Sequence, residues 1–279
     1  MLKRGLFTLM IGIFAAGCVS GGAGPKSTGA EEPGSQAGRH LRIFSTGAPE
    51  LAGGTEMIVR KPASLTLAQL REKYRSNFIL QGPSSPKRVA LTFDDVPDRY
   101  YTVQILDLLK RYHAKATFFI VGNRAEQNPD IVKRIVEEGH AIGNHSYTHA
   151  NLPKLSDIAF RNEVIMTQQA VKRITGQTMH FIRPPYGNIN DKQIKWLISQ
   201  KLKIVNWNVD SLDWKGLNAD QVEANIMGNV RSGSIVLQHG AGGKGEDLSG
   251  TVGALQRVIQ QLRESGIELV TIPHLLAPK

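Results

Sequence analysis

The sequence predicts an α/β protein built as a (β/α) barrel of about seven units, irregular or incomplete in its closure. From residue 87 onward, short runs of β-branched and aromatic residues alternate about seven times with segments of helical periodicity. Strands joined by helices pair in parallel through right-handed crossovers, and this number of repeats favours a barrel. An open, doubly wound sheet is the alternative. The chain shows neither a dinucleotide-binding glycine fingerprint after the first strand nor a phosphate-binding loop.

The individual elements follow from periodicity and from residues that start or stop helices. Strands are expected at 88–93, 115–121, 140–144, 180–183, 203–209, 234–238 and 267–272. Helices are expected at 102–113, 129–138, 157–175, 191–201, 219–230 and about 251–264. Residues able to cap the first N–H groups precede several of these helices, namely Asn128, Ser156, Asn190 and Asn218. Glycine follows the helices that end near residues 138, 175 and 264, which is typical of a helix C-terminus.

The amino-terminal end has the pattern of an export signal. Lys3 and Arg4 precede an apolar stretch at 6–16 that is too short for a membrane span of ~20 residues. Cleavage after Gly17 would leave Cys18, the single cysteine, at the mature N-terminus. The run FAAGC resembles a bacterial lipobox, in which that cysteine is lipidated. An ordinary secretory signal that leaves a free thiol is the alternative.

The stretch between this signal and the first strand divides into two parts. Residues 18–40 are rich in Gly, Ser, Ala and Pro and lack the large apolar residues needed for a core. Farther on, Leu67, Leu70 and Tyr74 share one face of a short helical pattern. The predicted organisation is a signal peptide at 1–17, a lipidated cysteine with a disordered linker at 18–40, a lead-in packing on the main domain at 41–86, and the main domain at 87–279.

The net charge of +10, of which Lys3 and Arg4 contribute two, limits the choice of partners. An exported basic protein meets anionic lipid headgroups and anionic wall polymers. The basic residues are scattered and form no stripe, so we expect no nucleic-acid partner. The expected localisation is that of a membrane-anchored lipoprotein facing the cell wall or periplasm, and we expect a monomer.

Ionisable residues lie at the carboxyl ends of five of the predicted strands or shortly after them. They are Asp94 and Asp95 after 88–93, His145 and His149 after 140–144, Arg183 in 180–183, Asp210 and Asp213 after 203–209, and His239 after 234–238. Barrel enzymes carry their chemistry at the carboxyl ends of the strands, where these side chains would converge. A helix cap or turn would explain the acidic pair taken alone. All five groups together predict one functional site.

His145 and His149 suggest half of a metal site. On a helical turn, residues four apart share a face, so both imidazoles could bind one ion. With one carboxylate of the acidic pair they form a three-ligand set that leaves positions open for water and substrate, as in catalytic zinc and non-haem iron sites. An isolated HxxxH pattern is weak evidence, and the acidic pair at the same rim makes it a prediction of a metal centre.

The segments LTFDD, HSYTH, RPPYG, DSLDW and IVLQH occur in the order and approximate spacing of the polysaccharide deacetylase (NodB homology) family, carbohydrate esterase family 4. The chain resembles this family from about residue 87 to 273. The resemblance implies a distorted (β/α) barrel and a divalent metal, most often zinc, with cobalt or another transition metal as alternatives. It also implies removal of acetyl groups from N-acetylated sugars. Val96 departs from the pattern, because a glycine usually follows the acidic pair.

The same resemblance assigns roles to individual residues. It gives the metal to Asp95, His145 and His149, the role of general base to Asp94, and the pairing partner of that base to Arg183. It makes His239 the general acid, oriented by Asp213, and it places the oxyanion beside the metal and the backbone N–H of Tyr186. Trp214 and Leu237 would line the pocket for the acetyl methyl group; core packing is the alternative, and both can hold. Four other histidines have no partner motif and are expected to be structural or exposed, namely His113, His140, His180 and His274.

The sequence therefore predicts a metal-dependent hydrolase of N-acetylglucosamine-type polysaccharide, using water activated by the metal, an Asp base and a His acid. Peptidoglycan is the polymer nearest to an exported, lipid-tethered protein and ranks above chitin. An O-acetyl esterase of the same family, acting for example on xylan, is one alternative. A non-catalytic wall-binding lipoprotein is another, and it predicts the loss of a ligand or catalytic position, whereas every such position is filled.

Overall fold

The computed structural model describes residues 69–70 and 72–278, all within the unit Leu41–Lys279. Its strands are β1 (Phe78–Ile79), β2 (Arg88–Val96), β3 (Thr117–Ile120), β4 (Ala141–Asn144), β5 (Phe181–Ile182), β6 (Lys203–Val205), β7 (Val209–Asp210), β8 (Ile235–His239) and β9 (Glu268–Leu269). Its α-helices are α3 (Tyr101–Arg111), α4 (Gly122–Gln127), α5 (Pro129–Glu137), α6 (Asp157–Thr175), α7 (Asp191–Ser199), α8 (Ala219–Met227), α9 (Ser249–Glu264) and α10 (Ile272–Leu275). Short 3₁₀ turns lie at Leu152–Lys154, Pro185–Gly187 and Asp213–Lys215.

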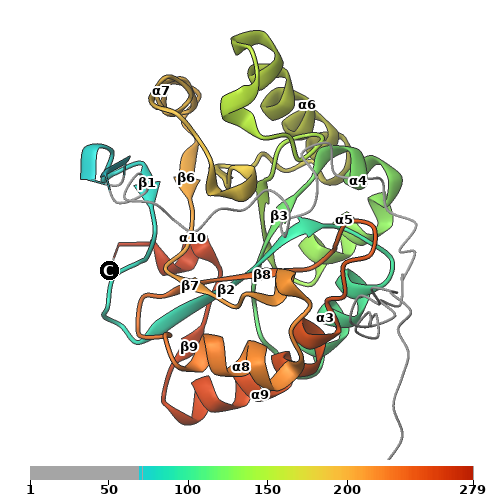
Figure 1. Cartoon of the computed structure of the whole chain (residues 1–279), viewed down its shortest axis with the longest axis vertical. Helices are drawn as coiled ribbons and strands as arrows, with labels where there is room; N and C mark the ends of the chain where they lie inside the picture. The colour runs from blue at the N-terminus through green and yellow to red at the C-terminus, as the bar shows by residue number, and fades with distance from the viewer. Residues whose placement is uncertain (1–68, 71, 279) are drawn as a thin grey trace, which may run out of the picture. The chain divides into compact units, whose positions relative to one another are not determined.

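The strands form one sheet in the order β1-β6-β5-β4-β3-β2-β8-β7, with β9 added to β2. Every pairing between these strands is parallel. Consecutive strands joined by helices account for the parallel pairing, as predicted. Figure 1 shows β2 crossing the middle of the molecule with β8 beside it, and helices on the outside.

The short connection between β6 and β7 requires the sheet to be curved. The sequence predicts one strand at 203–209, and this prediction is wrong: Asn206–Asn208 separate two strands that lie near opposite ends of the sheet. In a flat sheet the six intervening strand spacings would hold β6 and β7 about 29 Å apart. The four residue steps from Val205 to Val209 span at most about 14 Å. The sheet must therefore bend round into a partly closed barrel, which confirms the predicted fold class.

The two faces of β2 pack against different parts of the core. Val89, Leu91 and Phe93 lie in a core cluster that also contains residues of α3, α5, α8 and α9. Ala90 faces the other way, in a cluster with Ile235 of β8 and residues of α10. Thr92 and Asp94 continue this inner face towards the carboxyl end of the strand. The inside of the barrel is thus apolar at the amino end of β2 and polar at its carboxyl end.

Helix starts agree with the sequence in three cases and differ in one. Ser156 caps α6, and Asn190 and Asn218 form capping boxes at α7 and α8. Asn128 precedes α5, but its side chain makes no capping hydrogen bond, and its amide nitrogen donates to the Arg124 carbonyl of α4. The sequence did not predict α4, α10 or the two-residue strand β1, which are short elements with little periodicity.

A third cluster connects the segment before β2 to the barrel. Phe78 is fully buried among residues of β5, β6, α6 and α7, and Leu70 and Tyr74 pack against the same cluster. Phe78 and Ile79 pair with β6, so the sheet begins before the expected domain start at residue 87. The predicted signal peptide and Cys18 lie outside the described residues. None of the described helices combines the length and apolar character needed to cross a membrane.

Candidate metal centre and active site

A bulge at the end of β2 directs two adjacent carboxylates to the same side. Successive strand residues normally point to opposite faces, so Asp94 and Asp95 should diverge. The register with β3 shifts between Phe93 and Val96, and Asp95 has the left-handed conformation, with φ of 67°. Such a bulge re-aims a side chain. Asp95 therefore joins Asp94 on the inner side, and both are almost fully buried.

The segment that carries the two histidines is not helical. The helical-turn geometry expected for His145 and His149 is wrong, because the chain after β4 runs as an irregular turn. Ser146 and His149 have positive φ values of 62° and 58°. These two residues reverse the chain direction and bring both rings to the same place, with centroids 4.9 Å apart. The histidines converge as predicted, but by a different backbone geometry.

Asp95, His145 and His149 form a buried cluster whose ligand atoms lie within 4.8 Å of one another. Asp95 Oδ1 is 3.3 Å from His145 Nε2 and 3.1 Å from His149 Nε2. Ligands bound about 2.0–2.1 Å from zinc at tetrahedral angles lie about 3.3 Å apart, so the spacing fits such an ion. Within the described residues, the Asp95 carboxylate oxygens and His145 Nε2 make no hydrogen bond although they are buried. This donor set suits a divalent cation.

Hydrogen bonds at the far side of each ring fix which nitrogen faces the cluster. His145 Nδ1 lies 2.7 Å from the Arg183 carbonyl, which can only accept, so this nitrogen carries the proton. His149 Nδ1 lies 3.1 Å from the Tyr186 hydroxyl. His145 Nε2 then presents a lone pair towards Asp95, as metal-binding histidines do, and the Tyr186 hydroxyl orients the His149 ring so that its Nε2 also faces Asp95. Tyr186 itself adopts a left-handed conformation with φ of 61°, which places its ring against His149.

Opposing effects set the protonation of Asp95. Burial raises the pKa of this carboxyl, but the electrostatic effect of the neighbouring His149 and His145 imidazoles outweighs burial. The pKa of Asp95 consequently lies well below its usual range. The carboxylate is ionised at neutral pH, which is the form that a metal requires.

Arg183 is a fully buried cation beside Asp94. Its Nη1 lies 2.7 Å from Asp94 Oδ1 and 2.8 Å from the Thr92 hydroxyl. Its remaining donors reach the carbonyls of Val205 and Asn206 at 3.0 and 3.2 Å. The guanidinium also lies 4.1 Å from the centroid of the Phe119 ring. Asp94 is therefore held in one orientation, with its Oδ2 atom 3.7 Å from His145 Nε2.

His239 and Asp213 form a second buried pair. Asp213 Oδ1 lies 2.8 Å from His239 Nδ1, and its Oδ2 accepts from the His239 main-chain N–H and the Thr251 hydroxyl. Burial raises the pKa of Asp213, but the charge and hydrogen bonds of His239 hold it below its usual value. His239 and Asp94 stand opposite each other in the parallel register of β8 and β2. The two pairs thus face the same end of the barrel interior.

The other predicted site residues occupy the same rim. Leu237 precedes His239 by two residues and shares its face of β8, where it is buried. Trp214 is half-buried in the turn after β7, and its main-chain N–H donates to Asp213 Oδ1 at 2.9 Å. Val96 is fully buried in the outer core cluster and packs over Gly240, where an added Cβ would meet Val96 Cγ1 at 2.4 Å. Its departure from the family pattern is therefore accommodated in the core.

Sequence reasoning missed a buried arginine that supports the bulge. Arg124 of α4 donates from Nη1 to the Asp95 carbonyl and from Nη2 to the Gly242 carbonyl, each at 2.8 Å. It connects the metal-ligand bulge of β2 to the loop that follows His239.

Asn144 was missed as well. Its side-chain NH₂ group donates to the Val164 carbonyl of α6, and its side-chain oxygen accepts from the Ser146 N–H. Neither Arg124 nor Asn144 belongs to a motif, and only folding brings them to the site.

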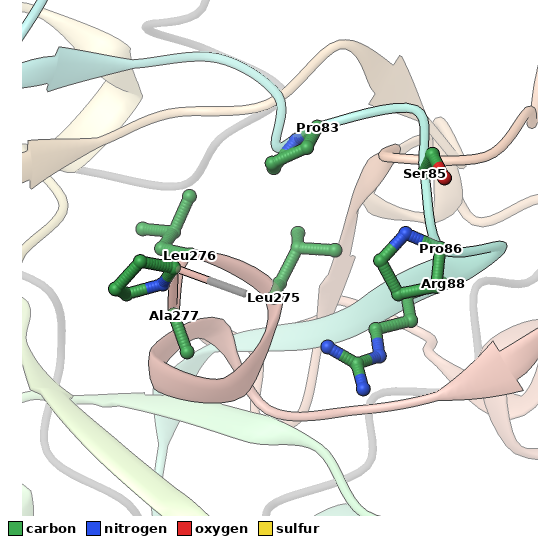
Figure 2. A pocket seen from close by; sticks show the side chains of 8 residues that line it. Pro83, Ser85, Pro86, Arg88, Leu275, Leu276 and Ala277 are labelled. Atoms are coloured by element: carbon green, nitrogen blue, oxygen red, sulfur yellow. The ribbon is translucent and has the colours of Figure 1, made fainter.

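A pocket at the other end of β2 is separate from this centre. Figure 2 shows its lining from the segment before β2 and from the C-terminal end, with Pro83, Pro86, Arg88 and Leu275 among the residues labelled. Arg88 begins β2, whereas Asp94 and Asp95 lie near the end of that strand. The pocket is therefore at the amino end of the strands, away from the ligand cluster.

Comparisons with known proteins agree with this arrangement. The family model described as polysaccharide deacetylase matches residues 81–205. A peptidoglycan-N-acetylglucosamine deacetylase of Bacillus cereus is 48% identical over 204 residues, which cover 73% of each chain. The crystal structure of the Bc1960 peptidoglycan N-acetylglucosamine deacetylase, in complex with an N-oxidanyl-benzamide, superposes with a TM-score of 0.70 and 45% identity, covering 77% of this chain and 97% of that one. A mutant of BA3943, a CE4 family pseudoenzyme with restored enzymatic activity, gives a TM-score of 0.67 and 34% identity over 72% and 71% of the two chains.

Proposed function

This chain belongs to the polysaccharide deacetylase family, and from that premise we propose that it hydrolyses the N-acetyl groups of a polymer of N-acetylglucosamine type, with peptidoglycan as its substrate. The products would be acetate and a free amino sugar. One observation carries the proposal: the buried cluster Asp95–His145–His149 stands beside two further pairs, Asp94–Arg183 and His239–Asp213. The proposed ligands, base and acid would thus act together at one end of the barrel.

We propose zinc as the ion that Asp95, His145 and His149 hold. Two imidazoles and one carboxylate are the ligand set of several catalytic zinc sites. When bound, such an ion lowers the pKa of a water molecule from about 15.7 to about 7 and polarises a carbonyl oxygen. An acetamide is a poor electrophile, and a general base alone accelerates a reaction by roughly 10²–10⁴-fold. Activation of the water and of the carbonyl by the metal is therefore needed as well.

Asp94 is the proposed general base. Its Oδ1 is occupied by Arg183, so Oδ2, the atom on the side of His145, is the one placed to accept a proton from the attacking water. Arg183 fixes the carboxylate with a charge-assisted hydrogen bond and is itself held by Thr92 and two main-chain carbonyls. The base therefore needs little reorganisation before it acts.

His239 is the proposed general acid. The nitrogen of an amide leaves poorly as an anion, so it must gain a proton as its bond to the acetyl carbon breaks. Asp213 lies 2.8 Å from His239 Nδ1 and orients the ring, which turns Nε2 away from Asp213. An ionised Asp213 also stabilises the imidazolium form that donates the proton.

Tyr186, Trp214 and Leu237 would bind the acetyl group. The backbone N–H of Tyr186 is the proposed donor to the tetrahedral oxyanion, and the two preceding prolines contribute no competing N–H. Leu237 shares the inner face of β8 with His239, which suits a wall for a methyl group. Trp214 is fixed next to Asp213 and would form the opposite wall.

Parallel acetate-release assays test this function. Peptidoglycan, a chitooligosaccharide and acetylxylan would be incubated with the chain, with and without a chelator, and with zinc added back. We expect release from peptidoglycan above the other two polymers, loss with chelator and recovery with zinc. Faster release from acetylxylan would favour the O-acetyl esterase alternative. No release from any of the three polymers by a zinc-loaded protein would favour the non-catalytic alternative.

We also propose that the chain is exported and anchored to the membrane through lipidated Cys18, facing the cell wall or periplasm. The supporting observations are the positive start, the apolar stretch at 6–16 and the FAAGC run. Mass spectrometry of the mature N-terminus should find a diacylated Cys18, and Cys18→Ser should move the protein from the membrane fraction to the soluble fraction. An unmodified N-terminal thiol would contradict the anchor. Sedimentation of the mature chain tests the expected monomer.

A further inference from the structure

We propose that Glu163 of α6 is a positioning residue of the metal centre. Its carboxylate fixes the turn formed by residues 145–149, and this turn brings His149 Nε2 to Asp95. The inference rests on the proposed metal site and adds to it a residue outside the family motifs. Among the described residues, the hydrogen bonds of the Glu163 carboxylate go to Tyr147 and Thr148, so it would act through the turn.

Glu163 accepts three hydrogen bonds from two consecutive residues of the turn. Its Oε2 lies 2.8 Å from the main-chain nitrogens of both Tyr147 and Thr148, and its Oε1 lies 2.8 Å from the Thr148 hydroxyl. A carboxylate that takes two adjacent N–H groups with one oxygen fixes the peptide plane between them. This Tyr147–Thr148 peptide is one residue away from His149, because only the Thr148–His149 peptide lies between them.

The turn has no regular structure that would place the histidines without such support. His145 directly follows β4 and is tied to the sheet through its main-chain N–H, which donates to the Ile120 carbonyl of β3. His149 lies beyond two residues that the α6 carboxylate holds, and it has a positive φ of 58°. On the other side of the turn, the N–H groups of Gly122 and Asn123 donate to the carbonyls of Ser146 and Tyr147. The turn is thus held between α4 and α6.

The consequence concerns the metal and not the stability of the whole domain. Asp95 and His145 are fixed by β2 and β4, whereas His149 depends on the turn. Removing the Glu163 carboxylate would let residues 147–149 relax and would move one ligand of the three. Partners that orient metal ligands typically change metal affinity by about 10–100-fold when removed.

The test compares full-length wild-type protein with Glu163→Gln, Glu163→Asp and the matched control Glu126→Gln. Glu126 is a useful control because it also contacts the turn, accepting from the Tyr147 hydroxyl at 2.6 Å, but it holds no main-chain N–H of the turn. Zinc affinity would be measured by competition with a chromophoric chelator. The visible spectrum of the cobalt-loaded protein would report ligand geometry, and thermal unfolding would report stability.

We expect Glu163→Gln to weaken zinc binding by about 10–100-fold and to alter the cobalt spectrum, because a neutral amide oxygen accepts the two main-chain N–H groups more weakly than a carboxylate oxygen and only one acceptor oxygen remains. Glu163→Asp keeps a carboxylate and should recover part of the loss. Glu126→Gln should stay within about threefold of wild type. If cobalt-loaded Glu163→Gln had the same spectrum as the wild type and its zinc affinity were unchanged, the role of Glu163 would be refuted while the proposed metal site would stand. A wild-type protein that binds zinc no better than Asp95→Ala would overturn the proposed metal site together with the role of Glu163.

Discussion

Arg183 Nη1 lies 2.7 Å from Asp94 Oδ1, and both side chains are buried. The same residue also reaches the metal ligands, because its main-chain carbonyl lies 2.7 Å from His145 Nδ1. One residue thus orients the proposed base through its side chain and one ligand through its backbone. These two functions can be separated by mutation, since only the first depends on the guanidinium.

Arg183→Lys should lower kcat and leave the metal content unchanged. A lysine ammonium cannot reach Asp94, Thr92 and two carbonyls with the geometry of a guanidinium, whereas the carbonyl that holds His145 is retained. We expect kcat to fall by about 10²-fold, within the range of general-base effects. Zinc content by atomic absorption is the control. Loss of zinc in step with kcat would show that the side chain also maintains the metal site.

Asp94→Asn should abolish most turnover while the protein still binds zinc. The amide keeps the shape of the side chain but cannot accept a proton as a carboxylate does. The expected fall in kcat is about 10²–10⁴-fold on the acetylated polymer. Asp95→Ala is the paired variant, and it should lose zinc as well as activity. Full turnover in Asp94→Asn would refute the base assignment.

Asp213→Asn should affect amide substrates more than activated esters. The substitution removes the carboxylate that orients His239 and stabilises its protonated form. An aryl acetate releases a phenolate that needs no proton, whereas the amine of an N-acetyl sugar does. We expect kcat on the N-acetylated substrate to fall by about 10²-fold or more, and kcat on the aryl ester to change far less. Equal losses on both substrates would argue against His239 as the acid.

Tyr186→Phe should weaken metal binding while leaving the proposed oxyanion donor in place. The variant removes the hydroxyl that lies 3.1 Å from His149 Nδ1 but keeps the main-chain N–H. Loss of such a partner typically costs about 10–100-fold in metal affinity or activity. Chelator competition measures the affinity, and kcat at saturating zinc measures the chemistry. A large fall in kcat with unchanged affinity would mean that the hydroxyl serves the substrate instead.

His140 should make the fold less stable below pH 6.5. Burial, and then the nearby charge of Lys115, lower the pKa of His140 from 6.5 to about 4. Between pH 6.5 and about pH 4, His140 is therefore protonated in the unfolded chain but neutral in the folded chain. Stability should therefore fall as pH drops through this window, by about 3 kcal/mol in total. His140→Asn keeps an acceptor for the Ala116 N–H and does not titrate. Urea unfolding from pH 4 to 7 should show a shallower pH dependence in the variant, and identical curves would exclude this effect.

Much of the fold follows from sequence pattern because it depends on local periodicity. The strands β2, β3, β4 and β8 and most helices were predicted to within a few residues, since burial on one face dictates the spacing of their apolar residues. The run at 203–209 was misread because its apolar residues suit one strand as well as two. Only the tertiary structure decides that the strand is interrupted at Asn206–Asn208, because β6 pairs with β1 and β5 whereas β7 pairs with β8.

The ionisable site residues could be named from the chain because they lie at strand ends, whereas Tyr186, Trp214 and Leu237 were named through the resemblance to the family. The geometry of the site could not be predicted. The sequence suggested a helical turn for His145 and His149, and the structure has an irregular turn in its place. Nor did any pattern indicate that Arg124 of α4 would donate to the Asp95 carbonyl. Such partners belong to different elements and have no fixed spacing.

The sequence by itself determined an alternating α/β protein with acids, imidazoles and an arginine at strand ends, and its motifs indicated the polysaccharide deacetylase family. Only the tertiary structure decided that adjacent Asp94 and Asp95 face the same way and that Asp95 Oδ1 lies within 3.3 Å of both imidazole Nε2 atoms. The physical reason is that a bulge and left-handed residues are locally unfavourable. They persist because buried hydrogen bonds from distant elements hold them, and a linear pattern does not encode those contacts.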